Sequence, residues 1–268
     1  MKIMILGDIF SSPGVNALTS SLEKIIKEKN INFVIANGEN AAENGLGITE
    51  EAAKKLFSGG VDVITSGNHI WDKREVADYI TKEARLLRPQ NLPEGSPGRG
   101  HGIYLSKCKN FKIAVLNLMG NVFMKKTENV FNSAKYLQDK IKLKKDADFI
   151  VVDFHGETTS EKQAMGHYFD GKVTALVGTH THVPTADTRI LEKGTGYQTD
   201  IGMCGDYNSV IGMDKNNSLM KFFKDEKADK NFPAKGEPTI SGVIVEGDIL
   251  TGLSKQIDRF ILGGVLKQ

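Results

Sequence analysis

The sequence is poor in cysteine and has no long apolar run. Its two cysteines, Cys108 and Cys204, lie far apart among 268 residues and form no CxxC pair. One disulfide between them is an open alternative, but free thiols in a reducing cytoplasm are favoured. The apolar N-terminal run soon meets Asp8, which makes it too short for a secretory signal, and nothing else approaches a membrane span. We therefore expect a cytoplasmic protein that makes no membrane contact.

A large excess of one charge and the common nucleotide-binding glycine motifs are also missing. The net charge of +2 does not predict a polyanion-binding surface. Lysines cluster at 140–146 and 221–230, but acidic and apolar residues interrupt them, which indicates solvated faces. The chain has no P-loop and no GxGxxG after its first predicted strand, so neither NTP hydrolysis nor dinucleotide binding is expected. With 40% hydrophobic and 25% charged residues, the composition is typical of a globular protein with a sizeable core.

What the sequence does contain is a regular alternation of short apolar runs and amphipathic segments. The apolar runs predict strands at 2–8, 32–40 and 61–69, and helical patterns follow them at 15–30, 49–60 and 72–83. This order predicts a parallel sheet. Later patterns predict strands at 112–120, 148–156 and 175–180, helices at 128–141 and 160–170, and an antiparallel hairpin from 239–248 and 253–262.

Local signals refine this division of the chain. Asp72, followed by Glu75, is a plausible cap for the third helix, and Ser160 with Gln163 has capping-box spacing. Residues 86–102 hold three of the seven prolines and His101, which indicates a long ordered loop. The glycine-rich segment 194–212 offers no chemistry of its own, and a structural loop is its simplest interpretation.

Polar residues of the kind that bind metals follow one predicted strand after another. In chain order they are Asp8, Glu39, Asn40, Asn68, His69, His155, His180 and His182. In open α/β sheets, ligands bind outside the carboxyl ends of the strands, so these side chains should converge. Mixed carboxylate, amide and imidazole donors suit Fe, Mn or Zn better than Mg or Ca. They are too many for one tetrahedral zinc, whereas two ions about 3.5–4 Å apart could share a bridging carboxylate.

Each of these residues also has an ordinary structural interpretation. Asp8 could cap a helix, Asn40 could be a turn residue, and His155 could be a satisfied core histidine. His101 and His167 lie outside the strand-end pattern and need no function. The structural interpretation does not account for ligand-type residues at successive strand ends.

The motifs that carry these residues resemble those of calcineurin-like metallophosphoesterases. They are GD at 7–8, GEN at 38–40, GNH at 67–69, FHGE at 154–157 and GTHTHVPT at 178–185. NGENAAENGLGIT, SGNHIWDKRE, RPQNLPEGSPGRG and TDIGMCGDYNSVIG are more specifically similar to the YmdB-like branch. Two positions depart from the superfamily: Phe10 replaces the DxH histidine, and Glu39-Asn40 replaces the second aspartate. Both departures are similar to the YmdB-like branch.

The resemblance implies a fold and a set of residue roles. The fold would be a four-layer α/β/β/α sandwich, one metallophosphoesterase domain over 1–268, with the metal site at the C-terminal ends of the strands. Two divalent or mixed-valence transition-metal ions are implied, with iron or manganese first and zinc as a further candidate. Asp8, Asn40 and His182 would bind one ion, Asn68, His155 and His180 the other, and Glu39 would bridge them. His69 would be the catalytic imidazole.

The implied activity is hydrolysis of a phosphodiester by a hydroxide that bridges the two ions. A small phosphate ester is the expected substrate, with 2′,3′-cyclic nucleotides as the best candidate. Two alternatives stay open: a phosphomonoesterase that acts on a nucleotide or phosphoprotein at the same site, and a regulatory module that binds RNA or protein and holds structural metals. RNA and a second copy of the chain are further conceivable partners.

Overall fold

The computed structural model describes residues 1–224 and 226–266, which contain two six-stranded sheets. In spatial order, the first sheet consists of β12 (Ser254–Leu262), β11 (Pro238–Gly247), β10 (Met203–Asp206), β1 (Lys2–Phe10), β2 (Phe33–Asn40) and β3 (Val63–Thr65). The second consists of β4 (His101–Leu105), β5 (Lys112–Met119), β6 (Phe149–His155), β7 (Ala175–Thr179), β9 (Gly196–Gln198) and β8 (Arg189–Ile190).

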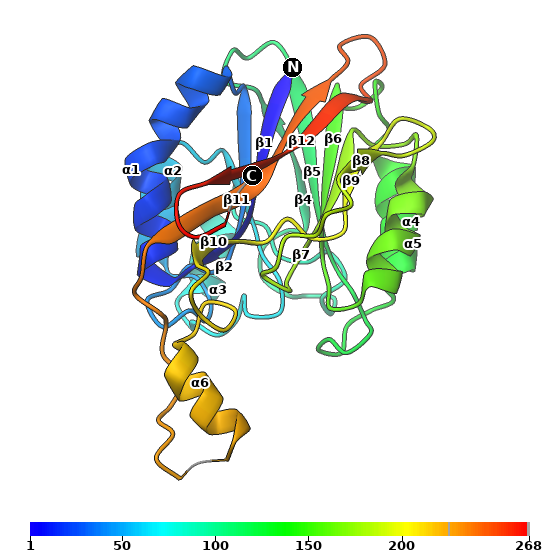
Figure 1. Ribbon diagram of the computed structural model, residues 1–268. Helices are drawn as coiled ribbons and strands as arrows, with labels where there is room; N and C mark the ends of the chain where they lie inside the picture. The colour runs from blue at the N-terminus through cyan, green and yellow to red at the C-terminus, as the bar shows by residue number, and fades with distance from the viewer. Residues whose placement is uncertain (225, 267–268) are drawn as a thin grey trace.

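The described residues form helices, most of which cover the outer faces of the two sheets (Figure 1). They are α1 (Ser11–Lys29), α2 (Glu50–Ser58), α3 (Val76–Lys82), α4 (Val130–Lys140), α5 (Thr159–Phe169) and α6 (Lys215–Phe222). In Figure 1, α1 and α2 lie on one side of the molecule, α4 and α5 lie on the other, and α6 projects away from the body. In the described part of the chain, no helix combines the length and the apolar character needed to cross a membrane.

Three apolar clusters hold the layers together, and alternation along the strands produces them. Ile3 and Ile5 of β1 pack with Val115 and Val151 between the sheets. Met4, on the opposite face of β1, belongs to the cluster under the helices of the first sheet. A third cluster lies between the second sheet and α4 and α5. The predicted four-layer α/β/β/α sandwich is therefore confirmed.

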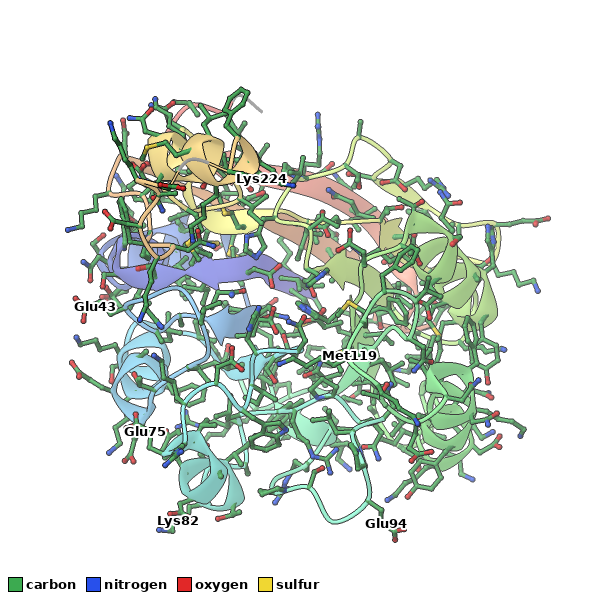
Figure 2. The ribbon with its side chains drawn as sticks, turned by 90° about the horizontal axis from the view of Figure 1, so that it is seen from below. Glu43, Glu75, Lys82, Glu94, Met119 and Lys224 are labelled. Atoms are coloured by element: carbon green, nitrogen blue, oxygen red, sulfur yellow. The ribbon has the colours of Figure 1, made fainter. Side chains whose placement is uncertain are left out.

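Parallel pairing brings the functional strand ends to one edge. β1, β2 and β3 pair in parallel, as do β5, β6, β7 and β9. Figure 2 views the molecule from below Figure 1, with Met119 at the end of β5 near the centre of the view. The predicted C-terminal hairpin is also confirmed, because β11 and β12 pair antiparallel.

Several local predictions were wrong. α1 begins at Ser11, directly after β1, and not near residue 15. Asp72 caps no helix: α3 begins at Val76, and the Asp72 carboxylate contacts the His69 ring instead. His101 is the first residue of β4, so the proline-rich loop, predicted to reach residue 102, ends at residue 100.

The capping box predicted for the fifth helix is also wrong. α5 begins at Thr159, so its N-cap residue is Thr158 and not Ser160. The N-cap side chain makes no cap hydrogen bond. The short strands β4, β9 and β10 and the helix α6 were not predicted. Strands of three to five residues carry too little periodic signal to be recognised alone.

Candidate metal centre

Asp8 lies inside β1, at a place where the strand is irregular. The pairing of β1 with β2 shifts register on both sides of Asp8, which turns its side chain out of the regular ladder. The carboxylate is fully buried, and its Oδ2 accepts a hydrogen bond of 2.9 Å from the His180 backbone N–H. Its Oδ1 has no hydrogen-bond partner among the described residues.

Glu39 and Asn40 end the neighbouring strand β2. Glu39 Oε1 lies 2.9 Å from His155 Nε2, and Oε2 accepts the His69 backbone N–H at 3.1 Å. Asn40 donates from Nδ2 to the Gly45 carbonyl at 2.8 Å. Its Oδ1 is buried and, within the described residues, has no partner.

Donor atoms from both sheets converge at His155 Nε2. Besides Glu39 Oε1, this nitrogen lies 3.1 Å from Asn68 Oδ1 and 3.0 Å from His180 Nδ1. Glu39, His155 and His180 each offer one ligand atom, and these atoms lie within 4.8 Å of one another. One imidazole proton can satisfy only one of these acceptors at a time, so the arrangement suits a cation better than hydrogen bonding alone.

Each of the three histidines has a polar partner at a ring nitrogen. His155 Nδ1 lies 2.9 Å from Thr179 Oγ1, and His182 Nδ1 lies 2.8 Å from the Ile211 carbonyl. His180 Nε2 lies 2.9 Å from Glu157 Oε2. Because these partners can accept a proton, the opposite nitrogen of each ring would be available to a bound cation. Metal-binding histidines are characteristically held in this way.

The hydrogen bond at His155 Nδ1 leads through Thr179 to the buried carboxylate of Asp153. Thr179 Oγ1 donates to Asp153 Oδ1 at 2.8 Å, and its oxygen accepts from the His155 ring. Asp153 also accepts from Thr65 and from Asn37 Nδ2. The Asp153 network therefore fixes the ring orientation and the tautomer of His155.

Backbone conformation, more than strand alternation, places His180 and His182. β7 ends at Thr179, and the two histidines then adopt φ values of 103° and 66°. Such positive φ values are uncommon outside glycine and are concentrated at functional sites. These φ values, and not the alternation of a strand, set the directions of the two side chains.

Electrostatics at the cluster favour bound positive charge. Burial opposes charge on His155, but the Glu39, Asp8 and Asp153 carboxylates raise its pKa to about 9. Burial likewise opposes ionisation of Glu39, yet His155 and a hydrogen bond from His69 lower its pKa to about 2. Burial, together with the charge on His155, lowers the pKa of His180 to about 3.

The residues fit the transition metals that the sequence implies. The two buried oxygens without partners, Asp8 Oδ1 and Asn40 Oδ1, are of the kind that cations satisfy. A side chain at Gly67 would collide with His155 and Glu39, so only glycine lets the two donors approach this closely. Carboxylate, amide and imidazole donors together can therefore hold divalent metal ions.

His69 lies at the rim of this cluster and not in its centre. Its backbone N–H binds Glu39, and its ring Nδ1 lies 2.7 Å from Asp72 Oδ2. The ring is 28% exposed, so it can be reached from solvent. Lys125 Nζ lies 3.6 Å from Asp72 Oδ1 and donates to the Asn68 carbonyl at 2.7 Å.

Segment 194–212, which had no predicted role, positions the site mainly through its backbone. Its Gly202 carbonyl accepts the Asp8 N–H at 3.1 Å, and its Ile211 carbonyl holds His182. Asp200, in the same segment, accepts the Thr181 N–H and pairs at 2.7 Å with Lys162 of α5, both side chains being 1% exposed. Backbone contacts of this kind leave no mark in a sequence.

Comparisons with known proteins agree with this architecture. A model of the YmdB-like protein family matches residues 4–260. The chain is 42% identical over 262 residues to the 2′,3′-cyclic-nucleotide 2′-phosphodiesterase of Bacillus subtilis, covering 98% of this chain and 97% of that protein.

Two solved structures share the whole fold. One is a hypothetical protein from Thermus thermophilus, with a TM-score of 0.89 and 34% identity, covering 99% of this chain and all of the other. The second is described as a novel phosphatase from Mycoplasma pneumoniae, with a TM-score of 0.89 and 34% identity, covering 98% of this chain and 93% of the other. By its sequence motifs, its fold and these matches, the chain belongs to the YmdB-like protein family.

Proposed function

We propose that this protein is a metal-dependent phosphodiesterase that hydrolyses 2′,3′-cyclic nucleotides. One observation carries the proposal: Glu39 Oε1, Asn68 Oδ1 and His180 Nδ1 all lie within 3.1 Å of His155 Nε2. The relative from Bacillus subtilis, described as a 2′,3′-cyclic-nucleotide 2′-phosphodiesterase, supports the choice of substrate.

The assignment of ligands follows the two sides of the cluster. We infer that Asn68, His155 and His180 hold one ion, and that Asp8, Asn40 and His182 hold the other. Glu39 would bridge them, because its Oε1 lies 2.9 Å from His155 Nε2 of the first set while its charge acts on Asp8 and His182 of the second. The two oxygens without partners on Asp8 and Asn40 support the second set.

When bound, divalent ions would acidify a water and neutralise charge on the phosphoryl group. Iron and manganese are the candidates that the donor set favours, followed by zinc. The imidazoles are held by Thr179, Glu157 and the Ile211 carbonyl, so little reorganisation is needed when ions bind. The two free cysteines support a cytoplasmic location for the enzyme.

His69 has the position and the partner of a general acid. Asp72 can accept from His69 Nδ1, which orients the ring and leaves Nε2 to face a substrate. A proton from His69 to the leaving ribose oxygen would complete the cleavage. The bond from the His69 N–H to Glu39 keeps this ring beside the ions.

A phosphomonoesterase at the same site is the second candidate. The Mycoplasma pneumoniae structure described as a phosphatase favours it. The chemistry of the ions would be the same, and the difference would lie in which phosphate esters the rim accepts.

The test is turnover of matched substrates by metal-depleted protein reloaded separately with Fe(II), Mn(II), Zn(II) and Mg(II). We expect hydrolysis of 2′,3′-cyclic AMP with iron or manganese, and much slower hydrolysis of 3′-AMP. His167→Ala is a matched control, because His167 is exposed on α5 and lies outside the cluster. Faster turnover of the monoester would reverse the assignment, and metal-independent turnover would remove the metal mechanism.

A further inference from the structure

The loop from Gly120 to Glu128 is attached to the metal centre at two points. At its start, the Gly120 N–H donates to the His155 carbonyl at 2.9 Å. Further along, Lys125 Nζ donates to the Asn68 carbonyl at 2.7 Å. Both carbonyls belong to residues assigned to the same ion, so the loop borders that side of the site. Met119, directly before this loop, lies near the centre of Figure 2.

Side-chain hydrogen bonds close the loop on itself. The Glu161 carboxylate accepts the backbone N–H groups of Asn121 at 2.8 Å and Val122 at 3.1 Å. Asn121 Nδ2 reaches across to Thr127 Oγ1 at 2.9 Å and to the Glu128 carbonyl at 3.0 Å. With both ends fixed, the tip between them has a defined position.

The tip presents an aromatic ring to solvent. Phe123 is 87% exposed and adopts a φ of 59°. A left-handed conformation is unfavourable for a bulky side chain, and an exposed phenylalanine buries none of its apolar surface. Neither property helps the chain to fold, so a role in binding is the better explanation.

We propose that Phe123 stacks on the nucleobase of a nucleotide whose phosphate lies at the metal centre. The inference rests on the proposed function and deepens it, because it makes the base, and not only the phosphate, part of what is recognised. Phe123 lies three residues from the His155 anchor and two from the Asn68 anchor. Stacking accepts every base but favours the larger face of a purine.

The test compares nucleotide binding to Phe123→Ala and to the wild-type protein. Both are loaded with Mn(II), and calorimetry gives the Kd of 3′-AMP, 3′-CMP and ribose 3-phosphate, which has no base. We expect Phe123→Ala to weaken 3′-AMP about tenfold or more, 3′-CMP less, and ribose 3-phosphate not at all. Phe123→Trp should retain the binding of 3′-AMP. Phe223→Ala is the control, because Phe223 is 84% exposed beyond the end of α6.

Two outcomes would overturn the inference. Equal weakening of all three ligands would show that Phe123 supports the loop and not the base. Unchanged binding of 3′-AMP would show that the ring contacts no base. Binding needs no turnover, so absence of cyclic-nucleotide hydrolysis would count against the proposed function alone, while the Kd values still decide on Phe123.

Discussion

The two sheets contribute different halves of the metal centre. The first sheet supplies Asp8 and Asn40, each with one buried oxygen that has no partner among the described residues. The second supplies His155 and His180, whose ring nitrogens are all engaged. The oxygen side carries an electrostatic cost that a bound cation would relieve, whereas the imidazole side is already organised.

The two halves should therefore control different properties of the site: how strongly ions are bound, and where they lie. Buried oxygens without partners cost free energy in the metal-free protein and return it when a cation binds, so they should govern how strongly ions are held. Imidazoles with fixed outer partners should govern where the ions lie. Glu39 spans the two halves, since it stands beside Asn40 at the end of β2 and its carboxylate contacts His155.

Glu39→Gln should produce the largest effect, because it removes the charge that links the halves. We expect both metal equivalents to fall and turnover to decrease on the order of 10³-fold or more. Elemental analysis of the purified variant measures the metal, with His167→Ala as the control. Two full equivalents in Glu39→Gln would show that Glu39 bridges nothing.

His69→Ala should separate catalysis from metal binding. We expect the variant to fold, to keep both ions, and to lose roughly 10²–10⁴ in turnover of 2′,3′-cyclic AMP. The loss should be smaller for a p-nitrophenyl phosphodiester, whose leaving group needs no proton. An equal loss on both substrates would assign His69 to stabilisation of the phosphoryl charge. Loss of metal would instead make His69 a ligand.

Asp153→Asn tests the imidazole side of the metal centre, because Asp153 supports His155 but is not itself a proposed ligand. The amide can still accept from Thr179, but it no longer supports the orientation of His155 with a negative charge. Loss of such an outer partner typically weakens metal affinity about 10–100-fold. Titration with Mn(II) measures this, and Asp139→Asn is the control, because Asp139 is exposed on α4. Unchanged affinity would mean that Thr179 alone orients the ring.

The parallel sheet and the convergence of strand-end residues could be predicted from simple rules, whereas the four layers were implied by the resemblance to metallophosphoesterases. Buried runs that alternate with helices force parallel strands, and the ends of parallel strands share one edge. Glu39 and His155 stand at the carboxyl ends of β2 and β6, and the packing of the two sheets brings these ends together.

Other parts of the site depend on contacts that a sequence does not display. His180 and His182 turn inward through positive φ values, which a period-two argument cannot foresee. The carbonyls of Gly202 and Ile211 hold Asp8 and His182, and any residue type could supply them. Asp72 carried a helix-cap signal, but it contacts His69 instead.

Asp8→Asn should have the smallest of these effects. It measures directly the free-energy cost of burying the Asp8 carboxylate without a cation. Burial, reinforced by the nearby carboxylates of Glu39 and Asp200, raises the pKa of Asp8 well above its ordinary value, although His155 opposes this. An acid whose pKa is higher in the folded protein makes folding less favourable as pH rises from the unfolded pKa through the folded one, by about 1.4 kcal/mol for each unit of difference.

The comparison between metal-free proteins isolates this contribution. Metal-free Asp8→Asn should therefore gain stability relative to metal-free wild type as pH rises from about 4 to neutrality. Glu39 and His155 titrate in both proteins. Their contributions therefore largely cancel when the free energy of unfolding of the wild type is subtracted from that of the variant. Urea unfolding across this pH range gives the measurement. A difference that does not change with pH would mean that Asp8 is not strained by its burial. Adding Mn(II) should reverse the ranking, since the wild-type carboxylate then has the cation that its unpartnered oxygen lacks.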